Sequence, residues 1–134
     1  MNGKIHRARV TGSDLHYIGS ITIDSHLLKQ ANILPFEKVQ VINLNTGGRW
    51  ETYAIEAPEF SGTVEINGGC ARLAEHDDIL IVISYVEISD AELEEWDPHI
   101  VMVDEKNRMT ELLRGGKKGF PADVLEREPY AFES

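Results

Sequence analysis

The feature that most constrains the fold is a series of short β-prone segments, separated by turn signals, within the first 85 residues. Apolar and polar side chains alternate in "SITID" and "KVQVINL", and less regularly in "KIHRARVT". This alternation predicts strands with one buried face. "DDILIVISYVEI" is mostly apolar, which is typical of a strand buried on both faces. Many short strands at this spacing indicate an all-β protein, either a small barrel or a sandwich.

Two short helices are expected among the strands. "DSHLLKQANIL" offers Asp24 or Ser25 as an N-cap, and Pro35 lies just beyond its end. Ser89 followed by Glu92 is a capping-box pattern that predicts a short acidic helix in "DAELEEW". "HIVMVDEKN" could then return as a last strand.

Length and composition favour one globular domain. The chain has 134 residues, of which 42% are hydrophobic, enough to bury a core. We expect this domain over residues 1–114 and a loosely attached tail over residues 115–134. The single Cys70 excludes an intrachain disulfide framework. No apolar run approaches the ~20 residues of a membrane span, and the N-terminus lacks a secretory apolar region, so a cytoplasmic protein without membrane contact is expected.

The charge distribution argues against nucleic-acid binding. The formal net charge is −10, whereas a protein that tracks phosphates needs clustered Lys and Arg. Eight carboxylates and no Lys or Arg lie between Glu87 and Glu105, while the first ten residues carry Lys4, Arg7 and Arg9 without an acid. An anionic ligand would be better received near the N-terminal end.

A glycine and a serine, Gly19-Ser20, interrupt the strand pattern of "HYIGSITID", where glycine costs stability and marks an unusual backbone path. Serine hydrolase chemistry is not supported, because G-x-S-x-G is absent and His16 would not lie beside Ser20 in a strand. The five histidines are scattered without a metal-binding motif. We therefore expect no metal site.

A Gly-Ser pair can also undergo self-cleavage. The serine hydroxyl attacks the carbonyl carbon of the preceding residue and converts the peptide bond to an ester. Elimination across the serine then cuts the chain, and hydrolysis of the resulting dehydroalanine leaves a pyruvoyl group. Glycine admits the contorted backbone that the attack requires, and a donor must stabilise the oxyanion. Alone, the pair is a weak signal, since most such pairs are turns.

The flanking sequences add a resemblance to a known family. "GKIHRARVTGSDLHYIGSITID", "GGRWETYAI", "EINGGCAR" and "ILIVISY" resemble the pyruvoyl-dependent aspartate 1-decarboxylases in order and spacing, over roughly residues 3 to 108. The resemblance implies a six-stranded double-psi β-barrel with short helices, assembled as a homotetramer with active sites at subunit interfaces. It also implies a lyase that releases CO2 from L-aspartate to make β-alanine for pantothenate biosynthesis.

The resemblance implies a role for each matching residue. Autocatalytic cleavage of the zymogen falls between Gly19 and Ser20, and Ser20 becomes the covalently bound pyruvoyl cofactor that forms a Schiff base with substrate. Thr52 matches the threonine that assists cleavage and contacts substrate. Tyr53 matches the proton donor, a role that suits a phenol because it is protonated at neutral pH. Arg49 matches the arginine that grips a substrate carboxylate.

Further matches complete the expected site. Lys4 corresponds to a second cationic group that binds substrate, and Gly68, Gly69 and Cys70 correspond to a substrate-binding loop. The resemblance implies supporting roles for Asn67, His6 and Tyr17.

Some features depart from the family or leave alternatives open. The loop reads "NGGCA" instead of N-G-A-A-A, and Asp77 stands where glycine is expected. In an extended strand, Thr52 and Tyr53 would point to opposite faces, so a bulge or an interface position would be needed to bring both into one site. A barrel that never forms the cofactor and has a binding or structural role remains an alternative, as does a decarboxylase for another acid such as glutamate. Whether an accessory maturation protein is needed also remains open.

Overall fold

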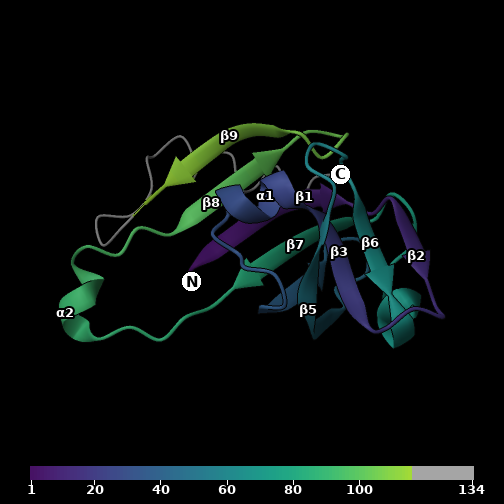
Figure 1. The fold of residues 1–134 in the computed structure, drawn as a ribbon, viewed down its shortest axis with the longest axis horizontal. Helices are drawn as coiled ribbons and strands as arrows, with labels where there is room; N and C mark the ends of the chain where they lie inside the picture. The colour runs from purple at the N-terminus through teal and green to yellow at the C-terminus, as the bar shows by residue number, and fades with distance from the viewer. Residues whose placement is uncertain (116–134) are drawn as a thin grey trace.

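The computed structural model describes residues 1–115, which form one mixed sheet of nine strands with short helices (Figure 1). The strand order is β2-β6-β3-β5-β4-β7-β1-β8-β9. This confirms the mainly β class. The elements in chain order are β1 (Gly3–Arg9), β2 (Gly12–Asp14), β3 (Ser20–Asp24), α1 (Ser25–Gln30), β4 (Lys38–Asn43), β5 (Arg49–Ala57), β6 (Val64–Asn67), the 3-10 helix η1 (Gly68–Leu73), β7 (Ile79–Ser84), α2 (Asp90–Leu93), β8 (His99–Val103) and β9 (Met109–Arg114).

The sheet combines antiparallel and parallel pairs. β7 pairs antiparallel with both β1 and β4, and its nearly continuous burial confirms the prediction of a strand covered on both faces. β3 lies between β5, its parallel neighbour, and β6, its antiparallel neighbour. The strand that begins at Ser20 is therefore interior to the sheet.

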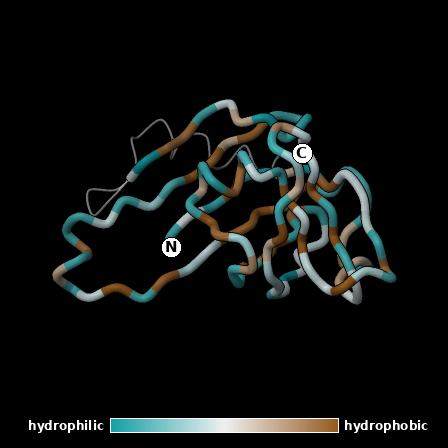
Figure 2. Tube along the Cα trace, viewed as in Figure 1, coloured by the Kyte–Doolittle hydropathy of each residue, from teal (hydrophilic) through white to brown (hydrophobic). Residues whose placement is uncertain are grey.

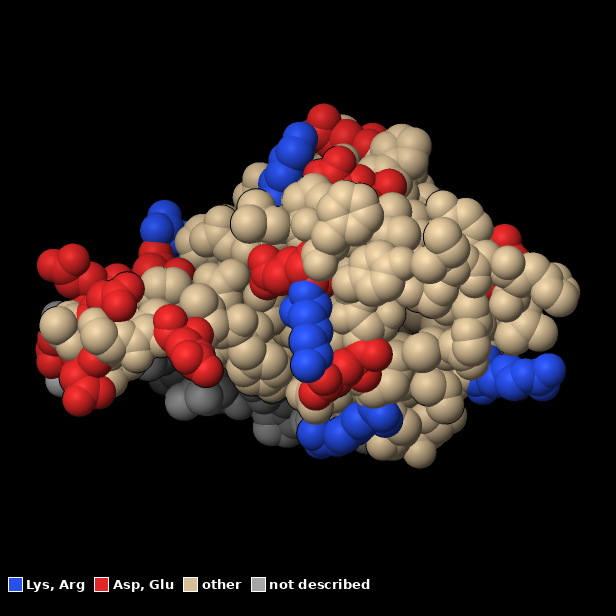
Figure 3. Space-filling model, turned by 60° about the horizontal axis from the view of Figure 1, so that its bottom comes forward, with Lys and Arg blue, Asp and Glu red and all other residues tan. Residues whose placement is uncertain are grey.

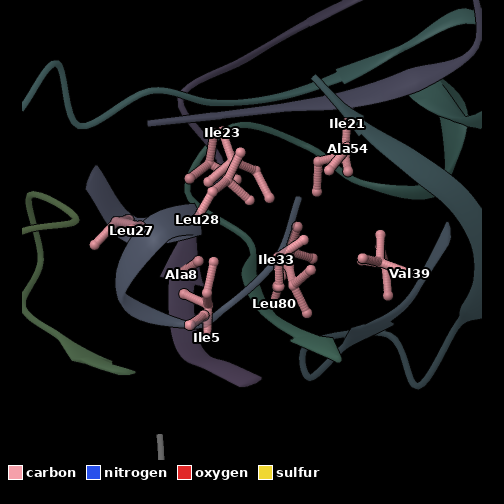
Figure 4. Close-up of a cluster of buried hydrophobic side chains, with 14 of the residues drawn as sticks. Ile5, Ala8, Ile21, Ile23, Leu27, Leu28, Ile33, Val39, Ala54 and Leu80 are labelled. Atoms are coloured by element: carbon pink, nitrogen blue, oxygen red, sulfur yellow. The ribbon is translucent and has the colours of Figure 1, made fainter. Parts of the chain in front are cut away.

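The hydrophobic core is built by the inward faces of these strands and by α1. Hydrophobic and hydrophilic stretches alternate along the trace (Figure 2). Burial of these apolar side chains is the main favourable term in folding. The residues labelled in the core view are Ile5, Ala8, Ile21, Ile23, Leu27, Leu28, Ile33, Val39, Ala54 and Leu80 (Figure 4).

The irregular alternation of "KIHRARVT" has a structural cause. Arg7 adopts φ 71°, and the β1–β7 register shifts between His6 and Ala8. A bulge of this kind inserts one extra residue into a strand. The consecutive residues Ile5 and His6 are both buried, as is Ala8, so burial along β1 does not follow a strict two-residue period.

Helix α1 confirms the helix expected in "DSHLLKQANIL", and its hydrogen bonds identify which of the two candidate residues is the N-cap. The Asp24 side chain accepts the backbone N–H of the second residue after it at 2.9 Å, so Asp24 is the N-cap. The helix ends at Gln30, earlier than the apolar run suggests. Asn32 adopts φ 60° and the Ile33 N–H bonds back to the Leu28 carbonyl at 2.9 Å, as in a Schellman motif.

Helix α2 confirms the capping box. The Ser89 hydroxyl accepts the backbone N–H of Glu92, and the Glu92 side chain accepts the backbone N–H of Ser89. The hydrogen bond from the Ser89 backbone, followed by that from its side chain, lowers the pKa of Glu92. Acidic side chains gather at the end of the molecule that carries α2 (Figure 3). Within residues 1–115, no helix is long and apolar enough to cross a membrane.

Three elements differ from the sequence-based expectations. The "NGG" turn opens a 3-10 helix, η1, and "TGSD" contributes the short strand β2, which pairs in parallel with β6. Beyond the expected β8, residues 109–114 form β9 and pair antiparallel with β8. The expected tail over 115–134 lies outside the described residues apart from Gly115.

Asp77 occupies a backbone conformation that favours glycine, with φ 72°. Its N–H bonds to the Val10 carbonyl at 2.8 Å, which fixes the turn before β7. A left-handed conformation costs most L-residues about 1–2 kcal/mol, less for Asp. Glycine would remove this strain, although its larger loss of backbone entropy on folding would offset part of the gain. We expect Asp77→Gly to stabilise the fold by up to about 1 kcal/mol and Asp77→Ala to destabilise it. Thermal melting checks this, and a lower melting temperature for Asp77→Gly would contradict it.

Candidate active site

Ser20 is the first residue of β3 and is fully buried. Its hydroxyl donates to the Ile18 carbonyl at 3.2 Å and accepts from the Asn67 side-chain amide at 3.0 Å. Asn67 is the directly opposite residue on β6. The same amide nitrogen donates to the Thr22 hydroxyl at 2.7 Å. The structure thus places Asn67 beside Ser20.

Gly68 lies against the backbone that precedes Ser20. A Cβ on Gly68 would be 2.5 Å from the Gly19 Cα, 2.7 Å from the Gly19 nitrogen and 3.1 Å from the Tyr17 carbonyl oxygen. Gly68 also adopts φ 69°. A Cβ is therefore excluded both by space and by conformation. The turn from β6 into η1 packs directly on the Tyr17–Gly19 segment.

Thr52 and Tyr53 lie on the neighbouring strand β5. The parallel register pairs Ile21 with Ala54. Ser20, one residue earlier on β3, therefore lies alongside Tyr53. The β4–β5 register has no shift from Arg49 to Tyr53. Thr52 and Tyr53 therefore keep the alternation expected of a regular strand, without a bulge that would bring them to one face.

Lys4, His6 and Arg49 lie on strands other than β3. Lys4 and His6 lie on β1, which is separated from β3 in the sheet order by β5, β4 and β7. Arg49 is exposed at the start of β5, four residues from Tyr53, which is about 13 Å along a strand. The cationic residues of the expected site are therefore distributed over other parts of the sheet.

The remaining expected residues differ in how exposed they are. The Tyr17 and Ile18 side chains are 51% and 69% exposed, so apolar groups beside the Gly19-Ser20 bond face outward. A Cβ on Gly69 would meet no atom within 4 Å. Cys70 is half-buried and packs against the hydrophobic core.

Thr22 is a residue of this site that sequence reasoning missed. It shares the face of β3 on which Ser20 lies, because residues two apart on a strand point the same way. Its short hydrogen bond uses one of the two N–H groups of the Asn67 amide and leaves the other for Ser20. The available signal was the Ser-x-Thr spacing in "SIT".

A comparison with protein families matches residues 1–110 to the family described as aspartate decarboxylase. The chain belongs to the aspartate decarboxylase family. The aspartate 1-decarboxylase of Thermoanaerobacter pseudethanolicus is 53% identical over 108 residues, covering 81% of this chain and 92% of the relative. That of Carboxydothermus hydrogenoformans is 49% identical over 112 residues, covering 84% and 88%. That of Maricaulis maris is 53% identical over 109 residues, covering 81% and 90%.

Two further observations bear on what this family member's site can hold. A cavity of about 430 Å³ is lined by Lys38, Val39, Gln40, Glu51 and Tyr85, none of which is an expected site residue. Within residues 1–115, no group of three or more His, Cys, Asp or Glu side chains is placed to hold a metal ion.

Proposed function

We propose that this protein is a self-processing enzyme that converts L-aspartate to β-alanine and CO2 with a pyruvoyl group made from Ser20. The observation that carries the proposal is the setting of Ser20. In a chain of the aspartate decarboxylase family, this serine follows a glycine, is fully buried and is hydrogen-bonded to Asn67.

The residues around Ser20 fit the self-cleavage chemistry. The Ser20 oxygen forms an ester with the Gly19 carbonyl carbon as the Gly19–Ser20 C–N bond breaks. The Asn67 amide donates to the Ser20 oxygen and positions it for attack, while negative charge develops on the Gly19 carbonyl oxygen and needs a separate donor. Gly68 fixes the approach of the Tyr17–Gly19 backbone. Loss of the Ser20 α-proton expels Gly19 as a carboxylate, and water then releases ammonia and leaves the ketone.

The pyruvoyl group supplies a carbonyl that takes up the substrate amine and accepts the electron pair that CO2 leaves behind. The chain's own residues then orient the substrate and move protons. Thr52 is proposed to polarise the Gly19 carbonyl during cleavage and to contact substrate afterwards. Within the described residues its hydroxyl makes no hydrogen bond to that carbonyl, so this role requires a movement at the start of β3 or β5.

Substrate binding supports an assembly of several copies. L-Aspartate keeps one carboxylate after decarboxylation, and the planar fork of Arg49 suits bidentate binding of such a group. Because Arg49 lies about 13 Å along β5 from Tyr53, we propose that Arg49 and Lys4 reach the site from a neighbouring copy. The exposed Tyr17 and Ile18 beside Ser20 suit burial at such an interface. A homotetramer with sites between subunits accounts for both observations.

The wider expectations are proposed on the same basis. We take the six-stranded double-psi barrel to lie within the nine-stranded sheet, and residues 1–114 to form the decarboxylase domain. β-Alanine production would serve pantothenate biosynthesis. A cytoplasmic location stays a prediction, as does the need for an accessory maturation protein.

Denaturing mass spectrometry of the purified protein tests the proposal. We expect fragments of residues 1–19 and 20–134 in place of one 15.1 kDa chain, with a carbonyl on the larger fragment that hydrazines trap. L-Aspartate should yield β-alanine and CO2, and L-glutamate should not. An uncut chain would favour the alternative of a barrel without the cofactor, and turnover of glutamate alone would redirect the substrate.

Tyr53→Phe separates processing from turnover. This variant keeps the ring but loses the phenolic proton, so it should self-cleave at the normal rate. Loss of a general acid typically costs 10²–10⁴-fold, and we expect kcat for aspartate to fall by about that factor. Cleavage is followed by mass spectrometry and turnover by β-alanine release. Normal turnover would show that Tyr53 is not the proton donor.

A further inference from the structure

Phe36 is held in a backbone conformation that a bulky residue rarely adopts. Its φ is 65° and its side chain is 74% exposed. A large aromatic residue in the left-handed region is an outlier, and exposing it to water adds no core packing. Strain of this kind concentrates at functional sites. The contacts of the Phe36 ring should therefore explain why a phenylalanine stands at this strained position.

The backbone around Phe36 is fixed against β5. The Phe36 N–H bonds to the Ala54 carbonyl at 2.7 Å, and the Ala54 N–H bonds to the Glu37 carbonyl at 3.0 Å. The Glu37 side chain accepts the Leu34 N–H at 3.0 Å and closes the turn. These bonds hold Phe36 and Glu37, the two residues before β4, against Ala54, the residue of β5 that follows Tyr53.

The ring of Phe36 stacks on the ring of Tyr53. Their centroids are 6.4 Å apart and their planes are 29° from parallel, within the range of favourable aromatic pairs. Tyr53 is half-buried, so one face of its ring would otherwise have room to move. A neighbouring ring on a fixed backbone limits the rotamers that the phenol can adopt.

We propose that Phe36 is a positioning residue that holds the Tyr53 phenol in the orientation from which it delivers its proton. This inference rests on the proposed function, because it takes Tyr53 as the proton donor. The ring contact of Phe36 is with Tyr53, so Phe36 would act through that residue. Its effect is on the fraction of time that the phenol is correctly placed, so it should act on kcat and leave KM nearly unchanged.

The test compares two phenylalanines that differ in the ring they contact. Phe60 also adopts a left-handed conformation, with φ 64°, and is 70% exposed, but its ring packs on His26 with centroids 4.4 Å apart. Asn tolerates this conformation, so Phe36→Asn and Phe60→Asn each remove a ring without adding backbone strain. The kcat and KM of both variants are measured after self-cleavage is complete. A third variant, Phe36→Tyr, keeps an aromatic ring at this position.

We expect Phe36→Asn to lower kcat by about three- to thirtyfold, with KM within twofold, normal self-cleavage and an unchanged or higher melting temperature. Phe60→Asn and Phe36→Tyr should keep the normal kcat. In the Tyr53→Phe background, Phe36→Asn should have no further effect on the residual rate, because no phenol is left to orient.

Several results would overturn the inference. They are a normal kcat for Phe36→Asn, an equal loss for Phe60→Asn, a full additional loss in the Tyr53→Phe background, or dissociation of the assembly in size-exclusion chromatography. If Tyr53→Phe itself turns over normally, the proton-donor role in the proposed function fails. If Tyr53→Phe is inactive and Phe36→Asn is normal, only the positioning role of Phe36 fails.

Discussion

A Ser20→Ala variant is expected to remain a single chain of 15.1 kDa and to release no β-alanine from L-aspartate. The substitution removes the only oxygen that can form the ester with Gly19, so the reactive ketone is never made. It also removes one acceptor of the buried Asn67 amide, whose second N–H keeps its bond to Thr22. The cost of about 1–3 kcal/mol for one unsatisfied group should leave the variant folded.

The experiment follows intact mass, hydrazine labelling and product release in parallel. Ser13→Ala is a suitable control, because it changes an exposed serine on β2 within the same N-terminal segment. This control should cleave and turn over normally. Two fragments from Ser20→Ala would show that another residue makes the cut, and the proposed origin of the cofactor would be wrong.

A Gly68→Ala variant is expected to lose self-cleavage or to slow it by at least about tenfold. The added methyl would be 2.5 Å from the Gly19 Cα and 2.7 Å from the Gly19 nitrogen, and these backbone atoms have no rotamer by which to move away. A left-handed alanine adds about 1–2 kcal/mol of strain. Relief requires the Tyr17–Gly19 segment to shift, and that shift misaligns the bond that Ser20 attacks.

The adjacent glycine provides the matched control for this prediction. A Cβ on Gly69 would have no neighbour within 4 Å, so Gly69→Ala should cleave normally and could gain up to about 1 kcal/mol of stability from reduced chain entropy. Cleavage rates are measured on freshly purified precursor by denaturing mass spectrometry, and folding is checked by thermal melting. Equal cleavage in the two variants would contradict a positioning role for Gly68.

The sequence was most informative where local chemistry determines structure. Asp24 caps α1, and Ser89 with Glu92 caps α2, because both caps are formed by residues within three positions of each other. Alternation predicted β3 and β4, and continuous apolarity predicted β7. Asp77 was singled out as standing at a glycine position, and its φ of 72° gives the physical reason.

The remaining features depend on contacts between distant segments. Strand β9 was missed because "MTELLR" has no regular alternation, and it is a strand through its pairing with β8. The left-handed conformations of Arg7 and Phe36 leave no local signature, since neither residue type favours them. The Ser20–Asn67–Thr22 hydrogen bonds likewise depend on the register of β3 against β6, which a single sequence does not provide.

If the chain cuts itself after residue 19, as proposed, the place of β1 in the sheet has a consequence. β1 lies between β7 and β8, and β2 pairs with β6, so the short fragment contributes interior hydrogen bonds to a sheet made mostly by the long one. Once made, the two pieces would stay interlocked without a covalent link. Heating or denaturant would release the short fragment, and refolding would then require two separate chains to associate. The mature protein should therefore show hysteresis between unfolding and refolding, whereas the uncut precursor should not.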